Sequence, residues 1–222
     1  MVPPRKEITD APFRFLFVGQ IIERKRLNLL VDALSMLPRE DFELIVIGDG
    51  PSSQYLRLWA DHALNGRVKW DGQIPMAEVR ERMSAADCLV LPSRHDGWGA
   101  VVSEALMAGT QAVCSDRCGA AEAVRASGAG GVFRSGDTGE LSRILQRLMA
   151  EGRPNPDRRR HLASWAKSLA VSAGAHYLES IFQHSEGDAE VPTPPWRAVG
   201  RNNFGSETNL SSSCSIERVR SV

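Results

Sequence analysis

The chain has 222 residues, of which 42% are hydrophobic and 24% are charged, a composition that excludes wholesale disorder and allows a compact core. Its 27 basic and 27 acidic residues cancel, so the chain lacks the long-range field that attracts nucleic acid, and we expect no nucleic-acid partner. The four cysteines are too few for a disulfide framework and indicate a reducing compartment.

Residues 1–12 form a polar lead-in without the apolar stretch of a secretory signal, and no apolar run in the sequence approaches membrane-spanning length. We therefore expect a cytoplasmic protein with no transmembrane segment. The alternative location is peripheral attachment to the inner face of the membrane.

From Phe13 onward, short apolar runs alternate with longer amphipathic segments. The runs predict six strands, at Phe13–Val18, Phe42–Ile47, Val68–Asp71, Cys88–Leu91, Ala112–Ser115 and Gly131–Phe133. The segments between them carry apolar residues at helical spacing, as in 27–37, 56–63 and 141–148. Runs that are apolar on both faces, such as 44–47, favour a parallel sheet between two helix layers. We predict an α/β domain over residues 13–184, with a doubly wound, mostly parallel sheet of about six strands.

The C-terminal part of the sequence changes character twice. Residues 158 to about 183 predict a long terminal helix with a bend at Gly174. From residue 185 the composition shifts to Pro, Ser, Asn and Gly, so we predict that 185–222 is a disordered tail.

The most informative loop follows the fourth predicted strand. Gly97 and Gly99 let the backbone approach a ligand, and their N–H groups precede a helix, where partial positive charge favours an oxyanion or a sugar hydroxyl. Helical side chains lean toward the N-terminus, so we expect the Glu104 carboxylate to point back toward Asp96. Two acceptors flanking one glycine loop suit the binding of polyols. The alternative is that Glu104 complements the helix dipole and Asp96 is a solvated loop residue.

Other loops give weaker signals. Gly19 ends the first predicted strand and basic residues follow it at a helix start, which would place Lys25 beside a phosphate; solvated charges are the alternative. Residues 48–51 predict a tight turn. Cys114 and Cys118 have no His or second Cys pair at zinc spacing, so we expect no metal site.

Together these motifs resemble the C-terminal, nucleotide-sugar-binding domain of GT-B glycosyltransferases of the retaining family 4, or group 1, type. The resemblance covers about Phe13–Gln183, and implies a single Rossmann-like half of a GT-B fold. It rests on the following segments: Pro92-Ser93, Asp96-Gly97-Trp98-Gly99, Glu104-Ala105-Leu106-Met107-Ala108-Gly109, Ala86–Leu91, Gly48-Asp49-Gly50-Pro51 and Cys118-Gly119-Ala120-Ala121-Glu122.

The resemblance implies roles for three catalytic residues. Glu104 would hold the ribose hydroxyls of a nucleotide sugar, Asp96 would touch the transferred sugar, and Lys25 would neutralise the diphosphate. The implied substrate-binding residues are Gly19, Gln20, Arg24, Lys25, Ile74, Asp96, Gly97, Trp98, Gly99 and Glu104. The implied reaction is hexosyl transfer in glycan or polysaccharide biosynthesis, with retained anomeric configuration. Positive charge replaces a metal, so neither a metal nor a cofactor is expected beside the nucleotide sugar.

The sequence also departs from the family. Gln20 stands where the family usually has arginine. One positive charge is therefore missing from the residues that would bind the diphosphate. The N-terminal domain that supplies the acceptor site has no counterpart in the sequence, so we expect a separate acceptor-binding domain or chain.

Two other functions stay open as alternatives. One is a non-catalytic nucleotide-sugar-binding module, either a truncated gene product or a subunit of a split transferase. The other is a dinucleotide enzyme, since residues 97–102 followed by Asp116 loosely imitate the Gly-x-Gly-x-x-Gly fingerprint. Val102 in place of the third glycine argues against it.

Overall fold

The computed structural model describes residues 11–38, 41–184 and 191–198. Its centre is one sheet of six strands, namely β1 (Phe13–Val18), β2 (Phe42–Ile47), β3 (Val68–Gly72), β4 (Cys88–Leu91), β5 (Gln111–Ser115) and β6 (Gly130–Phe133). All neighbouring strands pair in parallel, in the order β3-β2-β1-β4-β5-β6. This order confirms the predicted doubly wound fold, and its switch point lies between β1 and β4.

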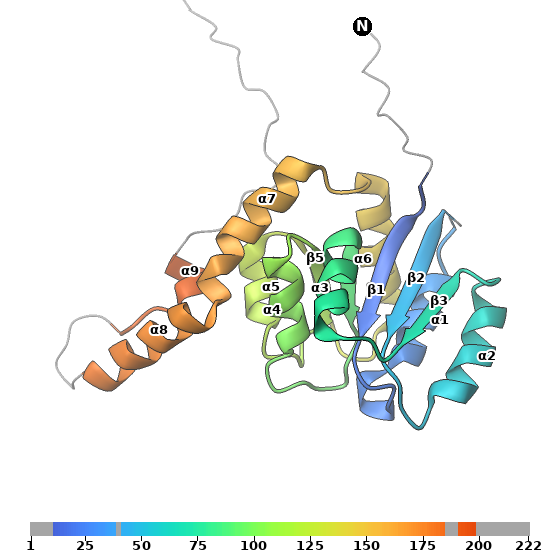
Figure 1. Cartoon of the computed structure of the whole chain (residues 1–222), viewed down its shortest axis with the longest axis horizontal. Helices are drawn as coiled ribbons and strands as arrows, with labels where there is room; N and C mark the ends of the chain where they lie inside the picture. The colour runs from blue at the N-terminus through green and yellow to red at the C-terminus, as the bar shows by residue number, and fades with distance from the viewer. Residues whose placement is uncertain (1–10, 39–40, 185–190, 199–222) are drawn as a thin grey trace, which may run out of the picture.

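Helices cover both faces of the sheet (Figure 1). They are α1 (Leu27–Ser35), α2 (Ser53–Ala63), α3 (Met76–Ala85), α4 (Ala100–Met107), α5 (Ala121–Ser127) and α6 (Thr138–Glu151), and a 3₁₀ turn, η1 (Glu23–Lys25), precedes α1. Helices α1, α2 and α6 contribute to one buried apolar cluster. Helices α3, α4 and α5 contribute to the other, on the opposite face.

Strand β1 shows how the sequence builds these two cores. Side chains alternate between the faces of a strand, so Phe15 and Phe17 pack with α1, α2 and α6, whereas Leu16 packs with α3, α4 and α5. All three side chains are fully buried. Burying each one stabilises the fold by about 1.5–3 kcal/mol.

The predicted single C-terminal helix is three elements: α7 (Pro156–Trp165), the 3₁₀ helix η2 (Ala166–Leu169) and α8 (Val171–Gln183). The predicted bend at Gly174 is wrong, because the break lies at Ala170, whose backbone is extended with ψ 154°. Gly174 lies inside α8 and its N–H bonds to the Ala170 carbonyl at 3.0 Å. Burial of Trp165 and Ala166 in the core accompanies the break, so packing rather than glycine decides where it falls.

Asp87 ties α7 to the sheet at the amino ends of the strands. Its side chain is fully buried, and its Oδ2 accepts from the Arg14 backbone N–H and from Arg153 Nε, both at 2.9 Å. Its Oδ1 accepts from Arg159 Nη2 at 2.8 Å. Burial lowers the pKa of Arg159. The amino-terminal edge of the sheet is thus held by charge-assisted bonds to one carboxylate.

Residues 191–198 differ from the predicted disordered tail. They contain a short helix, α9 (Pro195–Ala198), and Trp196 packs against the buried cluster of α3, α4 and α5. Composition alone did not predict this contact. The rest of the predicted tail and residues 1–10 of the lead-in lie outside the described residues. Within the described ranges, no helix combines the length and apolar character needed to cross a membrane.

Candidate functional site

Two loops at the carboxyl ends of β1 and β4 are joined by several contacts. The Arg94 N–H bonds to the Arg24 carbonyl at 2.8 Å, and Arg24 Nη1 bonds to the His95 carbonyl at 3.0 Å. Arg94 Nη2 lies 3.2 Å from Glu23 Oε1. These contacts bring the basic segment after Gly19 against the segment that carries Asp96, as expected at the switch point of a doubly wound sheet.

An ion pair forms the centre of this junction. Lys25 Nζ lies 2.5 Å from Asp96 Oδ2, and both side chains are only 15% exposed. Arg24 Nη1 lies 3.6 Å from the same oxygen, and Ser93 Oγ lies 3.4 Å from it. Two cations facing one carboxylate leave this group of three side chains with a net positive charge, which favours an anion beside it.

Lys25 occupies a slightly different place from the one predicted. It lies in the η1 turn, and Arg26, with φ 51°, separates that turn from α1. Its Cε atom lies 3.9 Å from the position that a Cβ atom would have at Gly19. The Lys25 side chain therefore extends over the end of β1.

The glycine loop is held against the loop between β5 and α5. Gly99 is the N-cap of α4 with φ 82°, and a Cβ atom there would lie 2.5 Å from Cys118 Sγ. A Cβ atom at Gly119 would lie 2.1 Å from the Gly97 carbonyl oxygen. Both positions therefore require glycine, because any other residue would force the two loops apart.

Backbone hydrogen bonds secure the same contact. The Asp96 N–H bonds to the Arg117 carbonyl at 3.0 Å, and the Ala120 N–H bonds to the Trp98 carbonyl at 2.7 Å. Asp96 also forms a parallel bridge with Cys118. The Asp96 and Trp98 backbones are therefore fixed by protein contacts before any ligand binds.

The Cys114 and Cys118 thiols lie beneath this junction. Their mutual hydrogen bond is the main cause that lowers the pKa of Cys118 and raises the pKa of Cys114. Cys118 Sγ also bonds to the Trp98 carbonyl at 3.2 Å. Both cysteines are free and buried, and no cluster of three metal-ligating side chains occurs among the residues that the structure describes. The two thiols act here as packing and hydrogen-bonding groups.

Three other predicted site residues do not join the ion pair by a direct bond. Glu104 lies in the second turn of α4 and is half-buried, whereas Gln20 is exposed. In the described ranges neither side chain has a hydrogen bond or an ion pair. Ile74 follows β3 and packs against the same buried cluster as Val101 of α4. The Glu104 carboxylate is thus free to accept from a ligand, and its orientation toward Asp96 stays a prediction.

Sequence reasoning missed several residues that support the loop. Trp98 Nε1 donates to Ser103 Oγ at 3.0 Å, and the Trp98 ring lies 5.5 Å from the Trp196 ring. The hydroxyl of Ser115 donates to the Ser93 carbonyl at 2.7 Å. Trp196 and Ser115 belong to distant elements, so no local pattern identifies them, whereas Ser103 lies five positions after Trp98 in α4.

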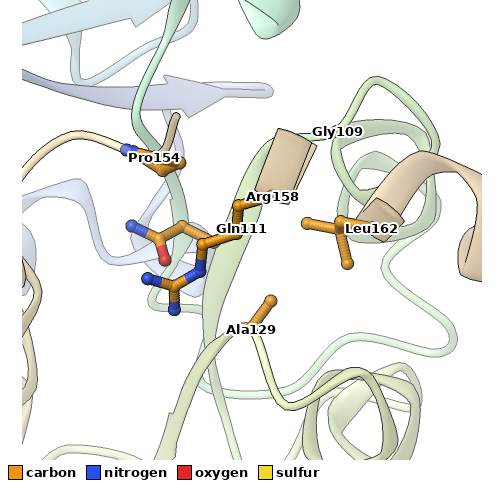
Figure 2. A pocket seen from close by; sticks show the side chains of 6 residues that line it. All are labelled: Gly109, Gln111, Ala129, Pro154, Arg158 and Leu162. Carbon is orange, nitrogen blue, oxygen red and sulfur yellow. The ribbon is translucent and has the colours of Figure 1, made fainter. Parts of the chain in front are cut away.

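Of two hollows, one lies away from this junction and the other adjoins it through Glu23, the partner of Arg94. The crevice in Figure 2 is at the amino-terminal edge of β5, where Gln111 and Arg158 line it, and it has no space for a water molecule. The second hollow, of about 350 Å³, lies among η1, α1 and α2 and is walled by Tyr55 and Trp59. Neither contains Lys25, Asp96 or the glycine loop.

The sheet order, the helix layers and the loops at the carboxyl edge define a class of protein: this is a Rossmann-like half of a GT-B fold. The chain belongs to the family described as "Glycosyl transferases group 1", whose model matches residues 3–168. The predicted fold and family are therefore confirmed.

Two relatives illustrate the match. The 2-deoxystreptamine glucosyltransferase of Streptomyces kanamyceticus is 29% identical over 168 residues, which are 74% of this chain and 43% of the relative. The amylovoran biosynthesis glycosyltransferase AmsK of Erwinia amylovora is 30% identical over 152 residues, which are 64% of this chain and 37% of the relative. The chain thus spans less than half the length of these relatives.

Solved structures agree with the fold. The apo form of the lipopolysaccharide outer core galactosyltransferase WaaB matches with a TM-score of 0.69 at 20% identity, over 79% of this chain and 50% of that one. Anabaena HepE in complex with UDP matches with a TM-score of 0.63 at 22% identity, over 78% of this chain and 50% of that one.

Proposed function

We propose that this chain is the donor-binding domain of a retaining glycosyltransferase and that it binds a nucleoside-diphosphate sugar at the carboxyl edge of its sheet. The observation that carries the proposal is the ion pair of Lys25 and Asp96, with Arg24 beside it and the glycine loop adjoining. Lys25 and Arg24 would face the diphosphate. Glu104 would accept from the ribose hydroxyls, and Asp96 from the transferred sugar.

The proposed catalysis depends on where negative charge develops during transfer of the sugar. As the bond between the sugar and the diphosphate breaks, negative charge grows on the departing phosphate oxygens. Fixed donors near those oxygens lower the barrier, because they require little reorganisation during the reaction. Lys25, Arg24 and the amides of residues 97–99 are the groups that would supply this stabilisation, which is why we propose a reaction that needs no metal ion.

The matched relatives are more than twice as long as the region they share with this chain, which leaves room for an acceptor site outside it. We propose that an acceptor-binding domain, in the same or another chain, completes the cleft, and that the enzyme works in the cytoplasm or at the inner membrane face. A non-catalytic nucleotide-sugar-binding module is the alternative, and it shares the same binding site.

Isothermal titration with UDP, GDP and ADP sugars tests donor binding. We expect one of these nucleotide sugars to bind. We expect Glu104→Ala to raise the Kd of that nucleotide sugar about thirtyfold, because hydrogen bonds to a charged group contribute about 2 kcal/mol. The Tm of Glu104→Ala should stay close to that of the wild type, because the carboxylate has no bond within the described structure.

Glu81→Ala is the matched control, because Glu81 is exposed on α3. It should bind as the wild type does. A folded wild-type chain that binds none of the three nucleotides would contradict the proposed function, and wild-type affinity in Glu104→Ala would contradict the ribose assignment alone. Release of nucleoside diphosphate in the presence of sugar acceptors, by this chain by itself, would contradict the need for a further domain.

A further inference from the structure

The short helix α9 contacts α5, α8 and η2 and lies beside the glycine loop. The Trp196 ring lies 5.5 Å from the Trp98 ring, tilted by 55°, and 6.3 Å from the Tyr177 ring of α8 in an edge-on arrangement. Both geometries are favourable for aromatic pairs. Residues 191–198 therefore contact the site region through an aromatic cluster.

Trp98 is the residue that this cluster constrains. Its carbonyl accepts from the Ala120 N–H at 2.7 Å, so its backbone is held by the β5–α5 loop. Its indole is held at the edge by Ser103 Oγ, 3.0 Å from Nε1, and Trp196 packs against the ring. Trp98 still remains 40% exposed, so a ligand has access to part of it.

The second contact of α9 reaches the neighbouring loop. The Arg197 guanidinium pairs with the Glu122 carboxylate, and Glu122 lies in the first turn of α5. The loop that leads into α5 is the one whose backbone bonds to Asp96 and Trp98. Helix α9 thus contacts both segments that meet at the glycine loop, one through Trp196 and the other through Arg197.

We propose that residues 191–198 form a strap that fixes the Trp98 side chain and thereby prepares the glycine loop for its ligand, so that Trp196 and Arg197 are positioning residues. This inference rests on the proposed function, because the ligand is the nucleoside diphosphate of the donor. An ordered Trp98 loses less rotamer freedom on binding, and each side chain that is ordered beforehand improves affinity.

The Trp196 indole shows which of its contacts matters for the strap. Its Nε1 atom is buried and has no partner within the described ranges. The indole therefore acts through ring packing and not through a hydrogen bond. A phenylalanine at this position should preserve the contact with Trp98, whereas an alanine should remove it.

The test uses the full 222-residue chain with Trp196→Ala, Trp196→Phe and Arg197→Ala, and with Phe182→Ala as the control because Phe182 is an exposed aromatic residue of α8. Near-UV circular dichroism without ligand reports the Trp98–Trp196 contact. Titration with UDP, GDP and ADP reports binding. We expect Trp196→Ala to lose the coupled tryptophan signal and to raise the Kd about tenfold, the equivalent of freeing one large side chain.

The remaining variants define the mechanism. Trp196→Phe should bind within about twofold of the wild type, Arg197→Ala should raise the Kd about threefold through a looser strap, and Phe182→Ala should change nothing. Arg197 is largely exposed, so Arg197→Ala should fold. It therefore tests the strap even if Trp196→Ala fails to fold.

Two results would overturn the strap: a wild-type Kd in both Trp196→Ala and Arg197→Ala, or a Trp196→Phe variant as impaired as Trp196→Ala. Failure of the wild type to bind any of the three nucleotides would instead contradict the proposed function. The circular dichroism comparison still decides in that case whether α9 docks on Trp98, because it needs no ligand.

Discussion

Lys25 and Asp96 satisfy each other in the protein without a ligand, and this contact has to change when an anion arrives. Their 2.5 Å pairing leaves little space between the two charges. A diphosphate would compete with Asp96 for the Lys25 ammonium, and Arg24, 3.6 Å away, is close enough to keep Asp96 partly neutralised. On the proposed function, the donor draws Lys25 toward the phosphates and frees an Asp96 oxygen for a sugar hydroxyl.

Replacement of Lys25 tests this exchange. We expect Lys25→Met to raise the Kd of the nucleoside diphosphate about thirtyfold, since a charge-assisted hydrogen bond contributes about 2 kcal/mol. The dependence of the Kd on salt should also weaken, because one cation fewer meets the anion. Titration at two salt concentrations measures both effects.

Lys167→Met is the control for the loss of one positive charge, since Lys167 is an exposed residue of η2. Its Kd and salt dependence should match those of the wild type. An unchanged Kd in Lys25→Met would assign the phosphate contact to other groups.

The local motifs name candidate residues for this site, but they do not show how those residues contact one another. Lys25 and Asp96 were both identified from local motifs, but they lie 71 positions apart, and only the fold shows that they touch. Gln20, which replaces the arginine expected by resemblance, is exposed. Arg24 is the neighbouring cation that the structure places near Asp96. The need for glycine at position 119 is likewise visible only in the fold, because the Gly97 carbonyl oxygen occupies the place of a Cβ atom there.

The strands are predicted to within one residue, and β1, β2 and β4 most directly, because each of these is a short run rich in apolar residues with glycine or polar residues beyond it. The C-terminal elements were predicted less well, since their limits depend on distant packing. Helical periodicity continues through residue 170, whereas burial of Trp165 and Ala166 decides where the chain turns. Helix α9 has a polar, proline-rich context, and its order depends on Trp196 meeting rings from other elements.

The attachment of α7 gives a prediction about stability. Asp87 is fully buried and bonds to two arginines. We expect Asp87→Ala to lower the free energy of unfolding by about 3 kcal/mol, because removal of one partner leaves buried charge and an unpaired N–H. Urea denaturation measures the change. Asp87→Asn should cost less, as it keeps an acceptor oxygen.

Asp61→Ala is a suitable comparison, because Asp61 is an exposed carboxylate of α2, and its loss should change stability by less than about 0.5 kcal/mol. A similarly small effect in Asp87→Ala would show that its ion pairs contribute little net stability. Donor affinity should be unaffected in folded Asp87 variants, since this clamp lies at the edge of the sheet opposite the site.

Across the whole molecule, the sheet separates the Asp87 cluster from the proposed binding site. The amino ends of the strands carry the Asp87 cluster and the closed crevice of Figure 2, while the carboxyl ends carry the ion pair and the glycine loop. Two apolar cores on opposite faces hold the strands in register between these edges. The carboxyl edge can therefore respond to a ligand without changes at the other edge.

Hydrogen–deuterium exchange with and without nucleoside diphosphate tests this division over the full chain. We expect slower exchange at residues 19–26, 94–100 and 116–120, which meet at the proposed site, and unchanged exchange at residues 52–59, which form the α2 wall of the hollow that Ile22 and Glu23 also border. A ligand at a hundred times its Kd should also stabilise the fold by about 2.7 kcal/mol. Protection around Tyr55 without protection at residues 94–100 would place the nucleotide in the α1–α2 hollow and overturn the assignment of the site to the carboxyl edge.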